Sequence, residues 1–190
     1  MEIFDVVDYE GRPTGETVTR EEAHEKGILH RTSHIWVISR NEGSLKVLLQ
    51  KRSMEKDSFP GQYDTSSAGH IQAGDGPLES ALRELHEELG IQAEEADLSF
   101  AGLFRINYVL EFHDKPFWDN EVTFVYVYDK AVDITKLTLQ KEEVEEVRWF
   151  GIDEVYAGTI NGDERFCVPM KGLLTLMNYL GYPEPVIEDN

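Results

Sequence analysis

The stretch GHIQAGDGPLESALRELHEELGI, from Gly69 to Ile91, carries the strongest information about the fold and chemistry of this chain. Pro77 suits the first turn of a helix, where its missing N–H would have no partner. Gly90 is typical of the left-handed residue that ends a helix. Between them runs one apolar stripe at helical spacing, made of Leu78, Leu82, Leu85 and Leu89. The spacing predicts a helix over residues 77–89.

Three carboxylates lie on the opposite face of that helix. Glu84, Glu87 and Glu88 stand at positions i, i+3 and i+4, so their side chains converge. Carboxylates held this close repel one another unless a cation lies among them. Oxygen ligands of this kind suit Mg²⁺, with Mn²⁺ as an alternative, and such ions are usually shared with substrate phosphates. A solvated acidic face is the simpler interpretation of the carboxylates taken alone.

The whole stretch resembles the Nudix box. In that box a Gly is followed after five residues by Glu, and after seven more by Arg-Glu-aliphatic-any-Glu-Glu-any-Gly-aliphatic. Gly69 and residues 83–91 match, and Asp75 stands in place of the first Glu. The resemblance implies a Nudix fold, metal binding by the three glutamates and hydrolysis of a diphosphate. Arg83 is expected to pair with a box carboxylate and orient it.

Strand patterns lie on both sides of the predicted helix. We expect strands over residues 3–7, 14–18, 34–39, 45–50, 63–67, 98–112, 121–128 and 144–149. Further helices are expected over residues 20–26, 152–157 and 166–180, and a loop over residues 114–120. This order favours the α/β class, as an α/β/α sandwich with a mixed β-sheet, which agrees with the Nudix fold. Residues 1–182 are expected to form a single Nudix domain and residues 183–190 a flexible tail.

Composition narrows the class of protein. The 37 acidic and 18 basic residues give a net charge of -19, which disfavours binding to nucleic acid. The single Cys167 excludes an internal disulfide and fits a reducing compartment. The acidic start lacks the pattern of a signal peptide, and no apolar run has the length of a membrane span. We therefore expect a cytoplasmic protein without a membrane partner.

A second resemblance extends from Ile3 to about Val155. It is to the isopentenyl diphosphate isomerases and their Nudix-hydrolase relatives, and it implies a second divalent metal. The positions that match the metal ligands of that branch are His24, His30, His70, Asp119 and Glu121. The segment QKRSMEKDSFPGQYD resembles the part that holds the diphosphate, which makes Arg52 and Lys56 the expected substrate-binding cations.

The isomerase interpretation fails at Ala68. Isomerisation needs a proton donor and a proton acceptor on opposite faces of the alkene, and the isomerases supply a Cys just before their Gly-His. Ala68 stands there in this chain and cannot move a proton. True isomerases also have degenerate box glutamates, whereas this chain keeps all three. The sequence therefore indicates a hydrolase on the isomerase-like branch.

The reaction expected is Mg²⁺-dependent hydrolysis of an organic diphosphate, either a prenyl diphosphate or a nucleoside diphosphate derivative, to monophosphate and phosphate. The expected catalytic residues are Glu84, Glu87, Glu88 and Glu121. The general base is left open among Glu84, Glu87 and Glu121. Trp118, in the predicted loop, is expected to bind the organic group. An isomerase and a non-catalytic ligand-binding regulator are the alternatives. The expected partner is a small-molecule diphosphate, and a homodimer is left open.

Overall fold

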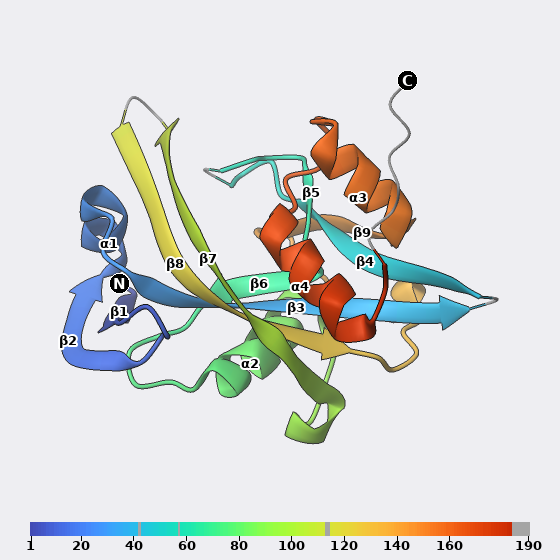
Figure 1. Cartoon of the computed structure of the whole chain (residues 1–190), viewed down its shortest axis with the longest axis horizontal. Helices are drawn as coiled ribbons and strands as arrows, with labels where there is room; N and C mark the ends of the chain where they lie inside the picture. The colour runs from blue at the N-terminus through green and yellow to red at the C-terminus, as the bar shows by residue number, and fades with distance from the viewer. Residues whose placement is uncertain (42, 57, 113–114, 184–190) are drawn as a thin grey trace.

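The computed structural model describes residues 1–41, 43–56, 58–112 and 115–183 (Figure 1). The helices are α1 (Arg20–Lys26), α2 (Pro77–Leu89), α3 (Ile152–Ile160) and α4 (Met170–Leu180), with 3₁₀ turns η1 (Glu95–Asp97) and η2 (Ile134–Lys136). The strands are β1 (Ile3–Val7), β2 (Pro13–Thr19), β3 (His30–Asn41), β4 (Ser44–Arg52), β5 (Tyr63–Asp64), β6 (Ser67–His70), β7 (Leu98–Phe112), β8 (Lys115–Tyr128) and β9 (Val144–Gly151). None of the helices in these ranges has the length and apolar character needed to cross a membrane.

The central sheet is mixed, as predicted. Its main path runs β5-β4-β3-β8-β7, with β6 paired to β3 and β9 paired to β4. Strand β3 runs parallel to β8 and antiparallel to β4 and β6. A separate two-stranded sheet joins β1 to β2 beside α1. Strand β3 thus lies at the centre of the sheet and pairs with three other strands.

Helices cover both faces of the sheet (Figure 1). Successive side chains of β3 point to opposite faces. Trp36 and Ile38 pack in one apolar cluster with α3 and α4, whereas Ile35 and Val37 pack in the other with α2. Because both faces are apolar and covered, the α/β/α sandwich is confirmed.

The helix predicted from the box has the expected bounds. Pro77 is its first residue, Gly76 is its N-cap, and Gly90 ends it in the left-handed conformation at φ 71°. Leu85 and Leu89 are fully buried against the sheet. The apolar stripe therefore anchors α2, which leaves the opposite side of the helix for the carboxylates.

Two boundaries differ from the prediction. The predicted loop over residues 114–120 is wrong, because residues 115–120 belong to β8 and continue its antiparallel ladder with β7, where Val109 faces Trp118. Asp114 lies outside the described residues. The predicted helix over residues 166–180 begins only at Met170, because Pro169 disfavours helical geometry in the residue before it.

Two smaller differences concern a strand and the tail. The strand predicted over residues 63–67 is divided into β5 and β6, which pair with different strands. The expected flexible tail lies outside the described residues apart from Pro183. Neither difference changes the layers of the sandwich.

The C-cap of α2 gives a test of the packing between this helix and the segment before β9. A Cβ at Gly90 would lie 3.0 Å from Thr138 Cβ and 3.1 Å from Thr138 N, whereas a Cβ at Gly181, the left-handed C-cap of α4, would meet no atom within 4 Å. Placing alanine in the left-handed region costs about 1–2 kcal/mol. We expect Gly181→Ala to lower the free energy of unfolding by that amount, and Gly90→Ala to lower it further. Urea denaturation measures both, and an equal loss in the two variants would contradict the Thr138 contact.

Candidate active site

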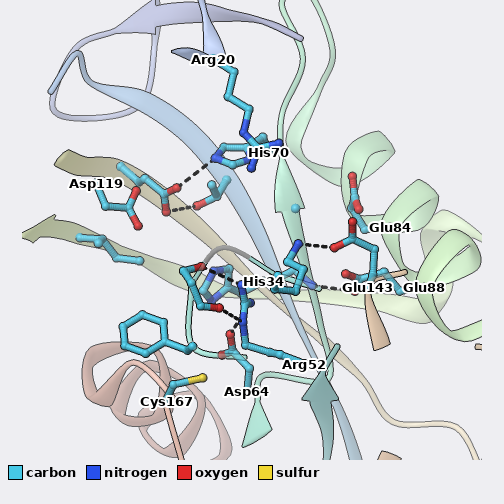
Figure 2. A pocket seen from close by; sticks show the side chains of 18 of the residues that line it. Arg20, His34, Arg52, Asp64, His70, Glu84, Glu88, Asp119, Glu143 and Cys167 are labelled. Atoms are coloured by element: carbon cyan, nitrogen blue, oxygen red, sulfur yellow. Dashed lines mark hydrogen bonds and ion pairs between the residues drawn. The ribbon is translucent and has the colours of Figure 1, made fainter. Parts of the chain in front are cut away.

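One cavity of about 580 Å³ brings the box helix and the predicted histidine site together. Figure 2 shows Glu84 and Glu88 of α2 on one side of the cavity and His70 of β6 with Asp119 of β8 on another. Arg52, at the end of β4, lies across from the box helix. Residues far apart in the sequence therefore face one volume.

Glu84 lies directly against the backbone of β6. A Cβ placed on Gly69 would be 2.2 Å from Glu84 Cδ and 2.4–2.5 Å from its carboxylate oxygens. No side chain fits at that distance, so only glycine lets the carboxylate approach the strand. This contact explains why the box needs a glycine fifteen residues before its first helical glutamate.

Glu88 is the buried member of the box carboxylates, with only 5% of its surface exposed. Its Oε2 atom accepts hydrogen bonds from Gln50 Nε2 at 3.0 Å and from Ala68 N at 3.1 Å. Burial raises the pKa of Glu88 to about 8, since desolvation disfavours the charged form. Glu87, in contrast, is exposed at the rim of the cavity.

Arg83 connects the box helix to the loop before it. Its Nη1 atom donates to Asp75 Oδ2 at 2.7 Å, and its Nη2 atom lies 3.3 Å from both Glu84 Oε1 and His70 O. Arg83 thus contacts a box carboxylate, in the way expected. The shorter Asp75 side chain still reaches the guanidinium.

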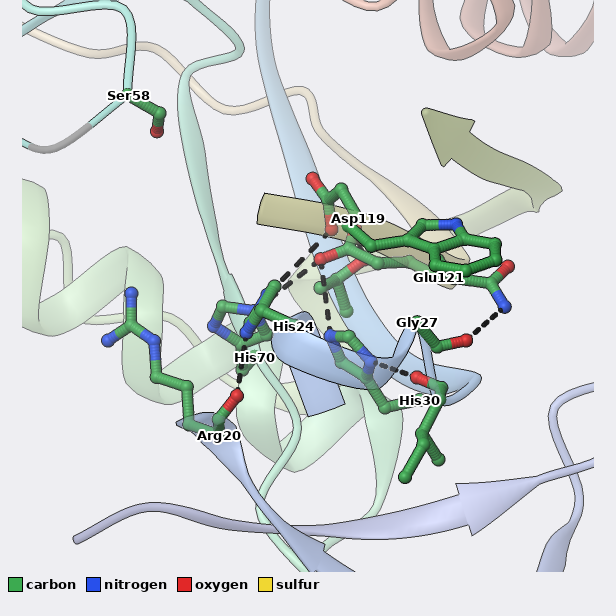
Figure 3. A network of polar contacts seen from close by, with 12 residues as sticks. Arg20, His24, Gly27, His30, Ser58, His70, Asp119 and Glu121 are labelled. Carbon is green, nitrogen blue, oxygen red and sulfur yellow. Dashed lines mark hydrogen bonds and ion pairs between the residues drawn. The ribbon is translucent and has the colours of Figure 1, made fainter. Parts of the chain in front are cut away.

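The histidines of the second predicted site come together with one carboxylate. Ligand atoms of His24, His30, His70 and Glu121 all lie within 4.8 Å of one another (Figure 3). Glu121 Oε1 is 3.4 Å from His70 Nε2 and 3.6 Å from His30 Nε2. Asp119 lies at the edge of this group, with its Oδ1 atom 3.9 Å from His24 Nε2.

Backbone carbonyls orient two of these imidazoles. His24 Nδ1 is 2.8 Å from Arg20 O, and His30 Nδ1 is 2.8 Å from Ile28 O. A carbonyl only accepts hydrogen bonds, so each Nδ1 is the donor and each Nε2 keeps a lone pair. The Nε2 atoms of all three histidines are buried without a hydrogen-bond partner among the described residues. Buried, unpaired nitrogens that converge on a carboxylate fit a divalent metal ion.

The charge states of the histidines also fit a divalent metal ion. Burial lowers the pKa of His24 to about 4 and also lowers the pKa of His70. Neutral imidazoles and an ionised carboxylate are the forms that bind metals.

Three further side chains support the histidines. Phe4 stacks on His30 and His70 with ring centroids 5.0 and 4.7 Å apart. Phe117 stacks on His24 at 4.3 Å. The hydroxyl of Thr32 donates to Glu121 Oε2 at 3.0 Å, which leaves Oε1 toward the imidazoles. A phenylalanine and a threonine in strand patterns carry no signal of such a role, since both are ordinary strand residues.

The two predicted phosphate-binding cations line the cavity but already have partners. Arg52 Nη1 is 3.1 Å from Asp64 Oδ2, and its other nitrogens donate to Ser58. Lys56 forms an ion pair with Glu143. Arg20, which the sequence did not single out, also lines the cavity and pairs with Glu2 at 2.9 Å.

Trp118 occupies a different place from the one expected. Its ring packs over Gly27, where an added Cβ would lie 2.2 Å away, and its Nε1 atom donates to Asn107. Among the described residues, Phe117 lines the cavity and Trp118 does not. Alternation along β8 turns these neighbours to opposite sides, which a loop prediction could not anticipate.

Comparison with known proteins agrees with the fold and the box. The NUDIX domain family model matches residues 29–167. The chain is 39% identical over 170 residues to Nudix hydrolase 3 of Arabidopsis thaliana. This match covers 88% of this chain but only 21% of that relative. It is also 39% identical over 154 residues to a Nudix hydrolase of Clostridium acetobutylicum, and that match covers 81% of this chain and 72% of that protein.

Solved structures show the same fold. The crystal structure of DR0079 from Deinococcus radiodurans superposes with a TM-score of 0.68 at 17% identity and covers 92% of this chain and 98% of that chain. The box, the sandwich and these matches lead to one conclusion: the chain belongs to the Nudix hydrolase family.

Proposed function

We propose that this Nudix hydrolase cleaves a diphosphate joined to a polar organic group, with divalent cations held by the box glutamates. The observation that carries the proposal is the charge of the cavity. Among the described residues, its lining holds ten carboxylates and four basic side chains, and each of those four is already paired with a carboxylate: Arg20, Arg52, Lys56 and Arg83. A diphosphate would be repelled from such a cavity unless cations bind there first.

The box residues fit Mg²⁺. Glu84, Glu87 and Glu88 supply carboxylate oxygens at the edge of one cavity, and oxygen is the ligand that Mg²⁺ prefers. Mn²⁺ is the alternative for the same donor set. When bound, such ions neutralise phosphoryl oxygens and lower the pKa of a bound water.

The protein's own groups would hold the substrate and accept the proton. Arg52 and Lys56 line the same cavity as the box glutamates, where they could exchange their carboxylate partners for the terminal phosphate. Glu121 is engaged by Thr32 and two histidines, so it is poorly placed to act as base. The general base is therefore Glu84 or Glu87.

The composition of the lining favours a polar organic group. Most of the described residues that line the cavity are charged or polar, and few of them are large apolar or aromatic side chains: Phe59, Ile106, Tyr108 and Phe117. A prenyl chain would leave many of the polar groups desolvated without partners, which is costly. A nucleoside diphosphate derivative offers hydrogen-bonding groups and a ring that can stack on an aromatic side chain. This supports the second of the two substrate classes predicted from the sequence.

We also propose a second divalent metal at His24, His30, His70 and Glu121, with Asp119 beside it. Three imidazoles and a carboxylate suit Zn²⁺, Mn²⁺ or iron better than Mg²⁺. The isomerase alternative has no support at Ala68, because its neighbours Ser66 and Ser67 are fully buried and do not line the cavity. A cytoplasmic location and a homodimer stay predictions from the sequence.

The direct test is ³¹P NMR of the protein with Mg²⁺ and a panel that contains nucleoside diphosphate derivatives and isopentenyl diphosphate. We expect monophosphate and phosphate signals to grow with the nucleoside derivatives. Cleavage of the prenyl compound alone would contradict the polar-group assignment. Movement of the alkene without cleavage, seen by proton NMR, would favour the isomerase.

Glu88→Gln tests the metal site of the box. The substitution keeps the shape of the side chain but removes its charge, so we expect turnover to fall about 100-fold or more, since loss of even an indirect metal contact costs 10–100-fold. Circular dichroism and the unfolding midpoint should change little. Glu79→Gln, on an exposed turn of the same helix, is the matched control and should keep full activity.

Gly69→Ala tests whether Glu84 acts from its present position. The new methyl group would overlap the Glu84 carboxylate and force it away from β6. We expect a loss of turnover of about 10-fold or more although no ligand is removed, because a displacement of 1 Å at a site can cost that much. Gly76→Ala, at the N-cap of α2, adds a methyl group that meets no atom within 4 Å and is the control. Full activity in Gly69→Ala would argue against a role for Glu84 in the reaction.

His70→Ala tests the second metal. Elemental analysis of the purified protein should find about one equivalent of a transition metal, and the variant should lose it. His86→Ala, at an exposed position of α2 outside this group, should retain the metal. Equal metal content in both variants would remove the proposed site.

A further inference from the structure

A buried glutamine interrupts the apolar run of β4. Val47, Leu48 and Leu49 are fully buried, and Gln50, the next residue, is only 4% exposed. Its backbone is fixed on both sides, because it pairs with Asp64 of β5 and Val147 of β9. A polar side chain in such a place is costly unless its amide has a specific partner.

That partner is one oxygen of Glu88. Gln50 Nε2 donates to Glu88 Oε2 at 3.0 Å, and Ala68 N donates to the same atom at 3.1 Å. Two N–H groups on one oxygen fix the plane of the carboxylate. Glu88 lines the cavity, and because both hydrogen bonds go to Oε2, we infer that Oε1 is the oxygen it can offer to a cation there.

The two groups that donate to Glu88 are neutral, whereas the group that donates to Glu84 is a cation. Glu84 is contacted by the Arg83 guanidinium, whose positive charge competes with a metal ion for the same carboxylate. A carboxamide orients a carboxylate without cancelling its charge. Glu88 therefore keeps its full charge for a cation once it is ionised.

We propose that Gln50 is a positioning residue, which aims Glu88 Oε1 at the divalent cation of the box. The inference rests on the proposed role of Glu88 as a metal ligand. A glutamate has three rotatable bonds, and without the amide the Ala68 N–H is the remaining donor to Glu88 Oε2. Partners of this kind typically contribute 10–100-fold to metal affinity.

The alternative is that Gln50 only satisfies a buried carboxylate and stabilises the fold. The two roles differ in what they affect. A structural role changes the unfolding midpoint alone, whereas a positioning role also changes the affinity for Mg²⁺ in the folded protein.

The test is Gln50→Met, which keeps an unbranched side chain of similar length and removes the amide. We expect the Mg²⁺ concentration for half-maximal turnover, and the dissociation constant for Mg²⁺ alone by titration calorimetry, to rise about 10–100-fold. Mg²⁺ is the probe because it prefers oxygen to imidazole and so reports on the box. If Gln50→Met does not fold, Gln50→Asn keeps the amide but is too short to reach Glu88, and it should show the same rise.

Leu49→Ala is the matched control. Leu49 is the neighbour on the same strand, fully buried in the cluster with α3 and α4 on the other face of the sheet. Its truncation should lower the unfolding midpoint while the dissociation constant for Mg²⁺ stays unchanged. A rise in Leu49→Ala as large as in Gln50→Met would overturn the inference.

Glu88→Gln separates this inference from the proposed function. If Glu88→Gln weakens Mg²⁺ binding and Gln50→Met does not, the positioning role is wrong and the metal site stands. If Glu88→Gln leaves Mg²⁺ binding unchanged, the metal site and the positioning role both fail. If Gln50 acts through Glu88, the double variant should bind Mg²⁺ no more weakly than Glu88→Gln alone.

Discussion

The crowding of carboxylates around one cavity is the constraint on which the rest of the site depends. Three of them are held by different kinds of partner: Glu84 by Arg83 and the backbone at Gly69, Glu88 by two N–H groups, and Glu121 by a hydroxyl and two imidazoles. Fixing one oxygen of a buried carboxylate leaves the other directed at the cavity. The carboxylates repel one another when no cation is bound, and this repulsion favours the binding of cations to the site.

Sheet topology explains why the histidines meet. In the antiparallel pair of β3 and β6, Thr32 lies opposite His70, and in the parallel pair of β3 and β8, His30 lies beside Glu121. His30, His70 and Glu121, which are separated by up to 91 positions in the sequence, thus come together across adjacent strands. His24 joins them from α1, which begins at the N-cap of Thr19 and ends at Gly27. The first 28 residues, which lie outside the matched family model, therefore supply one imidazole and the Phe4 ring.

For the basic residues, the sequence predicted a place at the cavity but not the ion pairs that they form there. Arg52 and Lys56 were expected to bind phosphate, and both line the cavity, yet each is paired with an acid that the sequence did not associate with it. A chain with a net charge of -19 offers many partners for every cation. Which acid pairs with which base depends on distances in space, and sequence separations of 12 and 87 residues do not contain them.

The sequence by itself determined the box helix, its ends and most of the strands on both sides, and it predicted the residues of both candidate metal sites. These features depend on local periodicity and on backbone conformations that few residues adopt, so they can be read from a single chain. Only the tertiary structure decided that residues 115–120 extend β8, that Phe117 replaces Trp118 in the cavity and that Gln50 holds Glu88. Those outcomes depend on the register between strands and on contacts across layers, where a shift of one residue reverses the direction of every side chain.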